Sequence, residues 1–164
     1  MITLEQLLQS REDRARHQRN LLGKTPGGAL VCLTVQLPGP QKRSSDSLII
    51  GNAGLEALRG AFPASAPEVR DLETGFEVYL PVMLPAARAK SICCGIEDTH
   101  PLGRLMDIDV ITAEGPLDRS AVGLEPRRCL LCSNSARYCM RARTHSTQEL
   151  LDKIHCMVSA YGQL

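Results

Sequence analysis

The sequence predicts a single domain of the α/β or α+β class, in which helices flank a mixed sheet. Its 164 residues are enough for one domain with its own core. Two apolar runs, residues 29–37 and 104–112, are rich in β-branched side chains and have the length of strands. Patterns typical of helices lie before, between and after these runs. Because strands and helices alternate along the chain, the class is α/β or α+β.

The first half of the chain contains a helix, a strand and a second helix. Thr3 and Gln6 form a capping-box pattern ahead of several leucines, so residues 3–22 are predicted to form one bent helix or two short ones. The run at residues 29–37 is a buried strand that ends at a rigid Pro-Gly-Pro loop. A helix is also expected over residues 46–60, although two glycines weaken its pattern.

The second half continues with a hairpin, a helix and a strand, followed by an irregular segment. Strict alternation of apolar residues within residues 68–82 predicts a hairpin that turns near its Thr-Gly pair. A short helix is expected over residues 85–97, and the second strong strand over residues 104–112. Residues 124–145 lack periodicity, whereas a Ser-x-x-Glu cap begins a last amphipathic helix over residues 146–162.

The composition argues against nucleic-acid-binding and membrane proteins. The chain has 19 basic and 18 acidic side chains, a net charge of +1, which excludes a generally basic nucleic-acid-binding protein. Only 3% of the residues are aromatic, too few for a base-stacking platform. No apolar run approaches the ~20 residues of a membrane helix, and the N-terminus lacks the layout of a secretion signal. We therefore expect a cytoplasmic protein without nucleic-acid or membrane partners.

The sharpest chemical feature is the pair Asp107 and Asp109 in the second strong strand. Side chains two residues apart in a strand point to the same face, so the two carboxylates should lie side by side. On an otherwise apolar strand they repel each other and lose hydration. A bound Mg²⁺ would relieve both costs, because it prefers hard oxygen ligands and keeps water or phosphate oxygens besides. The alternative is a solvated face of an edge strand, since Asp-x-Asp is a common pattern.

Several residues near predicted strand ends could contact phosphate. His100 and Gly103 lie in the loop before the aspartate strand, where a glycine would let a ligand approach the backbone beside Arg104. Arg14 shares one face of the first helix with Arg11 and Gln18, and Lys42 follows the stiff Pro-Gly-Pro loop. Taken singly, each of these residues could equally be a surface or turn residue.

A stretch of arginines lies between Glu125 and Glu149, where the chain has no acidic residue. In a chain that is otherwise neutral, this stretch predicts a local anion-binding surface. Phosphate is the favoured partner, because arginine binds it with two hydrogen bonds and aromatic side chains for nucleic acid are scarce. The alternative is a solvated face. The arginines are Arg127, Arg128, Arg137, Arg141 and Arg143.

Three cysteines and one histidine, residue types that bind metal ions, lie close together in the same stretch. Cys129, Cys132, Cys139 and His145 have spacings that could form a tetrahedral Cys₃His zinc site, with the first two cysteines as a zinc knuckle. The alternative is a set of reduced thiols, one of which could have redox chemistry if the arginines lower its pKa. The odd total of seven cysteines and a cytoplasmic location argue against a disulfide framework.

Several motifs in order identify a family resemblance. The C-terminal half contains His100-Pro-Leu-Gly-Arg-Leu-Met-Asp-Ile-Asp-Val110, Glu125-Pro-Arg-Arg-Cys-Leu-Leu-Cys132, Cys139-x-Arg141 and His145-Ser146. The N-terminal half contains Arg11-Glu-Asp-Arg14, Gln18, Thr34-Val35 and Pro38-Gly39-Pro40 with Lys42. Together they resemble the holo-citrate-lyase synthases, also called apo-citrate-lyase phosphoribosyl-dephospho-CoA transferases. The resemblance covers nearly the whole chain, but residues 44–90 match only in pattern, and Met106 stands where an aromatic residue is expected.

The resemblance implies one catalytic domain, residues 1–164, with a nucleotidyltransferase-like fold. Such an enzyme transfers the prosthetic group of triphosphoribosyl-dephospho-CoA to a serine of the acyl carrier (gamma) subunit of citrate lyase and releases pyrophosphate. By analogy, Asp107 and Asp109 would be the Mg²⁺ ligands, and one of them would take the proton of the serine. Glu97 is a further candidate for a metal ligand or base.

The donor and the carrier would share the basic residues. Arg104, Arg127 and Arg128 are expected to hold the triphosphate, with help from Lys42 and Arg14. Because carrier proteins are usually acidic, part of the stretch from residue 137 to 143 would bind the carrier instead. A competing hypothesis is a non-enzymatic zinc-knuckle module that binds protein or nucleic acid, but it does not explain the aspartate pair. A third alternative keeps the enzyme class and changes the carrier.

Overall fold

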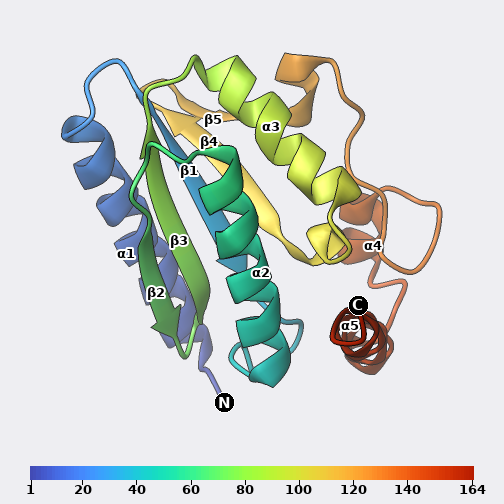
Figure 1. The fold of residues 1–164 in the computed structure, drawn as a ribbon. Coiled ribbons are helices and arrows are strands. Elements are labelled where there is room, and N and C mark those ends of the chain that lie inside the picture. Colours follow the sequence, from blue (N-terminus) through green and yellow to red (C-terminus); the bar gives the residue numbers. More distant parts are fainter.

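The computed structural model describes residues 1–164, which form one five-stranded sheet with helices on both faces (Figure 1). The strand order is β2-β3-β1-β4-β5, and every neighbouring pair is antiparallel. The predicted single domain is thus confirmed, and of the two predicted classes, α/β and α+β, the structure has the second. The strands are β1 (Ala29–Val35), β2 (Glu68–Leu72), β3 (Gly75–Val82), β4 (Asp107–Thr112) and β5 (Gly115–Leu117).

The sheet is antiparallel throughout, although alternating strands and helices predict some parallel neighbours. Helix α2 (Ser45–Ala61) connects β1 to β2, and helix α3 (Ala86–Thr99) connects β3 to β4. Each of these connections joins two strands that run in the same direction. In both cases a third strand lies between the joined strands: β3 separates β1 from β2, and β1 separates β3 from β4. The crossovers therefore leave no parallel pair hydrogen-bonded.

Helix α1 (Leu4–Gly23) is one continuous helix and covers one face of the sheet alone (Figure 1). The predicted capping box is present: the Thr3 hydroxyl accepts from the Gln6 backbone, and the Gln6 side chain accepts from the Thr3 N–H at 2.9 Å. Apolar contact with the sheet comes from Leu21 and Leu22 in the last turn of α1. No residue of α1 is fully buried, and Arg14 and His17 add polar contacts with Glu77 and Glu68 of the sheet.

The main core lies on the opposite face, under α2 and α3. Alternate residues of β1 point into it, among them Val31 and Leu33, and they meet apolar side chains of both helices. The glycines that weaken the α2 pattern have a packing role there. A Cβ added at Gly51 would lie 2.4 Å from the Phe76 ring, so the missing side chain lets α2 approach the sheet.

The C-terminal third differs most from the sequence prediction. Residues Gly103–Leu105 form a 3₁₀ turn, so the predicted strand over residues 104–112 begins only at Asp107. The segment 124–145 contains a short helix, α4 (Ala136–Ala142), which is too short to show periodicity. Helix α5 (Thr147–Tyr161) begins at the predicted Ser-x-x-Glu capping box and buries Ile154 and Val158. None of the helices combines the length and apolar character needed to cross a bilayer.

Candidate active site

The predicted carboxylate pair lies on the sheet face that α1 covers. Asp107 is exposed and Asp109 is partly buried, and both alternate with the core residues Ile108 and Val110. The two carboxylates therefore point to the same face of the strand, as the two-residue period of a strand predicts. Burial, followed by the neighbouring charge of Asp107, raises the pKa of Asp109 to about 6. Burial and the like charge of Asp107 therefore both disfavour the ionised form of Asp109.

A third carboxylate, Glu77, lies on the same face and was not found from the sequence. Thr34 of β1 pairs with Glu77 on one side and with Asp107 on the other, so the three residues form one row across the sheet. Glu77 is only 3% exposed, and its carboxylate accepts hydrogen bonds from Arg14 Nε at 2.9 Å and from the Tyr79 hydroxyl. The strand alternation places Glu77 opposite the core side chains, but only the strand order places it near Asp107.

The structure brings two of the predicted phosphate contacts, Arg14 and Lys42, to the α1 side of the molecule. Arg14 Nη2 is buried and has no hydrogen-bond partner, although Nε of the same guanidinium pairs with Glu77. Lys42 Nζ donates to the Leu37 carbonyl at 2.8 Å. Burial, together with the positive charge of Arg11 from α1, lowers the pKa of Lys42. Arg11, Arg14 and Lys42 therefore supply positive charge beside the carboxylate face.

Glu97 and Arg127 lie on the α3 side of the sheet and bind each other. Glu97 is 3% exposed, and Arg127 Nη1 donates to its Oε2 at 2.8 Å, while Arg119 Nη2 approaches its Oε1 at 3.4 Å. Arg127 also donates to the carbonyls of Gly103, Arg104 and Met106, so both terminal nitrogens of its guanidinium are engaged by protein oxygens. This geometry favours a structural role for both residues over the predicted roles in proton transfer and triphosphate binding.

Other residues predicted to contact substrate also hold the loop before β4 in place. His100 Nδ1 accepts from the Leu102 N–H at 3.0 Å. A Cβ at Gly103 would lie 2.4 Å from the Glu97 carbonyl, so this glycine permits close packing on the end of α3, which accounts for it without a ligand. Arg104 donates to the Arg128 carbonyl, and Arg128 Nη1 donates to the Ser133 carbonyl at 3.0 Å. Burial lowers the pKa of Arg104, and the neighbouring positive charges of Arg127 and Arg119 lower it further.

The four predicted zinc ligands come together, although they are spread over 17 positions of the chain. Their ligand atoms all lie within 4.8 Å of one another, and the thiols of Cys132 and Cys139 are 3.4 Å apart. The Leu131 N–H donates to Cys129 Sγ at 3.4 Å, and the Asn134 N–H, with nearby His145, lowers the pKa of Cys132 to about 6. His145 Nε2 is buried with no hydrogen-bond partner. The cluster is compatible with a zinc ion.

A family model and similar curated proteins all carry the same family description. The family model described as "Apo-citrate lyase phosphoribosyl-dephospho-CoA transferase" matches residues 2–161. A protein of Escherichia coli O6:K15:H31 with that name is 37% identical over 96% of this chain and 89% of its own length. A protein of Streptococcus pyogenes serotype M18, named as a probable member, is 34% identical over 98% of this chain and 87% of its own length.

Fold, site and comparisons together define an α+β enzyme of the transferase class. A non-enzymatic zinc-knuckle module is not favoured, because the match extends over the whole sheet as well as the cysteine cluster. The chain belongs to the apo-citrate lyase phosphoribosyl-dephospho-CoA transferase family.

Proposed function

We propose that this protein transfers the prosthetic group of triphosphoribosyl-dephospho-CoA to a serine of the acyl carrier (gamma) subunit of citrate lyase. The serine oxygen attacks the innermost phosphorus of the triphosphate, a new P–O bond forms, and the bond to pyrophosphate breaks. The serine proton passes to a base on the enzyme. The observation that carries the proposal is the set of three carboxylates, Glu77, Asp107 and Asp109, on the sheet face that α1 covers, in a chain of this family.

Asp107 and Asp109 would hold a Mg²⁺ ion. The donor set fits, because two carboxylates on one face offer the hard oxygen ligands that Mg²⁺ prefers and leave room for phosphate oxygens. Such an ion neutralises charge that develops on the leaving pyrophosphate. One of these two aspartates would also be the base that takes the serine proton. The site as a whole would then be of the nucleotidyltransferase type.

The triphosphate would lie between the aspartates and the basic residues around them. Arg14 and Lys42 approach from α1 and the loop after β1, and Arg104 approaches from the turn that begins β4. Arg128 is a weaker candidate, since one of its terminal nitrogens already binds a backbone carbonyl. Arg127 and Glu97 would support this site indirectly by fixing the backbone of residues 103–106.

The carrier would dock on the outer face of α4. Arg137 and Arg141 are four residues apart on this helix and both are exposed. Two large apolar side chains on the same short helix are also exposed: Tyr138 at 58% and Met140 at 77%. An exposed apolar contact rimmed by arginines complements an acidic carrier.

The decisive test of the transfer function is a mass measurement on the carrier. Purified protein, Mg²⁺ and triphosphoribosyl-dephospho-CoA should convert the apo-carrier of citrate lyase to a species heavier by one phosphoribosyl-dephospho-CoA group. One pyrophosphate should be released for each carrier modified. An unchanged mass with the citrate lyase carrier, but a shift with the carrier of another lyase or decarboxylase, would assign a different acceptor. No shift with any carrier would refute the transfer.

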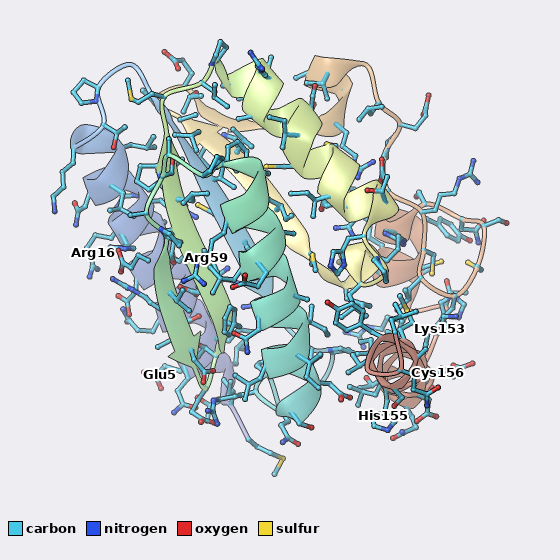
Figure 2. The ribbon with its side chains drawn as sticks, viewed as in Figure 1. Glu5, Arg16, Arg59, Lys153, His155 and Cys156 are labelled. Carbon is cyan, nitrogen blue, oxygen red and sulfur yellow. The ribbon has the colours of Figure 1, made fainter.

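Charge reversal on α4 tests the carrier surface. The double variant Arg137→Glu/Arg141→Glu should weaken carrier binding by about tenfold or more, an effect that decreases as salt is added, because exposed charges are screened. Its affinity for the donor should be unchanged. Arg59→Glu is the matched control, since Arg59 is an exposed arginine on α2, remote from α4 (Figure 2). Equal losses in both variants would show a non-specific charge effect and contradict this docking surface.

We also propose that the Cys₃His cluster holds a structural Zn²⁺ ion. Zn–S bonds of about 2.3 Å in a tetrahedron place two sulfur ligands about 3.8 Å apart, near the observed 3.4 Å between Cys132 and Cys139. The unpartnered Nε2 of His145 would become the fourth ligand atom. The ion would join the knuckle at residues 129–132 to α4 and to the start of α5, which are otherwise connected by irregular chain.

Purified protein should therefore contain about one equivalent of zinc, measured by mass spectrometry of the metal. Removal of the ion with a strong chelator should lower the melting temperature by about 5 °C or more, because metal binding is linked to folding. Cys139→Ser should lose the metal, whereas Cys156→Ser, at an exposed cysteine outside the cluster, should retain it. Metal-free protein with an unchanged melting temperature would show that these are ordinary thiols.

A further inference from the structure

We infer that a cleft beside the N-terminal half of α1 binds the nucleoside portion of the donor, that is, its purine and the ribose attached to it. This inference rests on the proposed transfer and locates the part of the donor that does not react. The cleft has a volume of about 750 Å³ and lies between the first three turns of α1 and the β2–β3 hairpin. Its volume is in the range of small-molecule sites. Glu5 marks its outer end, beside the tip of the hairpin (Figure 2).

The cleft exists because α1 packs on the sheet only at its other end. Leu21 and Leu22 form the apolar contact, whereas the first half of the helix offers polar side chains to the sheet. Only three of the 13 lining residues are apolar, so the cleft suits a polar ligand better than an aliphatic chain. This argues for the nucleoside of the donor and against its pantetheine arm.

Two buried polar atoms without protein partners belong to lining residues. Ser10 Oγ and Arg14 Nη2 make no hydrogen bond, and the two residues are one helical turn apart on the same face of α1. Buried polar groups are nearly always paired, so these two atoms on one cleft wall are available to a partner from outside the chain. The Ser10 hydroxyl can pair with a ribose hydroxyl, and Arg14 Nη2 can donate to the same ribose or to the phosphate that follows it.

The charge of the cleft distinguishes the nucleoside from the triphosphate. Its lining includes four carboxylates and two guanidinium groups, a net charge of −2, which disfavours a polyphosphate. Carboxylates instead accept hydrogen bonds from ribose hydroxyls and from the amino group of a purine. The charged lining residues are Glu5, Asp13, Glu73, Glu77, Arg14 and Arg70.

The cleft is also at the right distance from the aspartates. Glu77 lines the cleft, and Thr34 is the single residue between it and Asp107 across the sheet. Two strand spacings separate Glu77 from Asp107, about 10 Å. A phosphoribosyl unit spans such a distance, so the triphosphate can reach the aspartates while the nucleoside occupies the cleft.

Dephospho-CoA, which lacks the triphosphoribosyl group, is the probe for the test, with phosphopantetheine as the comparison ligand. Calorimetric titration of the full-length protein should show binding of dephospho-CoA and no measurable binding of phosphopantetheine. Ser10→Leu, which fills the cleft, should weaken dephospho-CoA at least tenfold. Ser10→Ala should weaken it severalfold without lowering the melting temperature, because it removes an unpaired hydroxyl. Ser159→Leu and Ser159→Ala, at an exposed serine of α5, should have no effect.

The outcomes separate this inference from the transfer function. If wild-type protein modifies the carrier but both Ser10 variants bind dephospho-CoA normally, the cleft is not the nucleoside site and the transfer stands. If phosphopantetheine binds and its affinity depends on Ser10, the cleft holds the other arm of the donor and the inference is wrong. If dephospho-CoA binding depends on Ser10 but no carrier is modified, the nucleoside site stands and the proposed transfer fails.

Discussion

Asp107→Asn and Asp109→Asn should each lower the rate of carrier modification by about a thousandfold or more, equivalent to about 4 kcal/mol of transition-state stabilisation. Each substitution removes half of the proposed Mg²⁺ site while keeping the size of the side chain. Both variants should remain folded, because neither carboxylate takes part in an ion pair within the protein. Intact-mass time courses of the carrier, at saturating donor and Mg²⁺, measure the loss.

Stability measurements on the same two variants separate a loss of catalysis from a loss of folding. The pKa of Asp109 is raised in the folded state, so its charged form destabilises the fold near neutral pH. Asp109→Asn removes this charge and should therefore raise the free energy of unfolding of the metal-free protein by up to about 3 kcal/mol. Asp152→Asn, at an exposed acid on α5, is the matched control for both activity and stability. Near-wild-type transfer by either aspartate variant, in protein shown to be folded, would eliminate the proposed metal site.

Glu97→Ala should cost about 3–5 kcal/mol of folding free energy, because it removes one side of a buried ion pair. The substitution leaves the partly buried guanidiniums of Arg127 and Arg119 without their shared carboxylate, and it removes the acceptor of the Ile108 N–H. Urea denaturation followed by circular dichroism gives the free energy. Where the variant does not fold at all, Glu97→Gln, which keeps the acceptor oxygen, supplies a measurable intermediate value.

The neighbouring acid provides the control for Glu97. Asp98 also binds Arg119, at 2.8 Å, but its side chain is 49% exposed. Asp98→Ala should therefore cost no more than about 1 kcal/mol, because solvent screens an exposed pair. Comparable losses at the two positions would mean that the ion pairs around Arg119 and Arg127 do not depend on burial, and that the structural role assigned to Glu97 is wrong.

The local elements could be predicted because their signals are local. The capping boxes at Thr3 and Ser146 each involve residues three apart, and the hairpin at residues 68–82 shows its period of two within eight residues. The order of the strands could not be predicted, since it depends on which distant strand pairs with β1. Helix α4 was not predicted because it is too short. Its seven residues complete about two turns, too few for a periodic pattern.

The same distinction applies to the candidate site. The Asp107–Asp109 geometry follows from strand period alone, and the Cys₃His cluster follows from its spacing. Glu77 becomes a neighbour of Asp107 only through two strand pairings, so no motif indicates it. The sequence also assigned the same anion-binding role to all arginines between residues 127 and 143. Charge and chain position do not show that Arg127 faces Glu97 and three carbonyls, whereas Arg137 faces solvent.

The central position of β1 has a consequence for how the chain folds. Its pairing partners are far away in sequence: Ala29 pairs with Val82, and Leu30 pairs with Ile111. Only in the β2–β3 and β4–β5 hairpins are strands that follow each other in the sequence also paired in the sheet. Non-local pairing of this kind slows folding, because long loops must close before the contacts form. During synthesis, β1 would leave the ribosome long before β4, and the carboxylate row could assemble only after most of the chain had emerged.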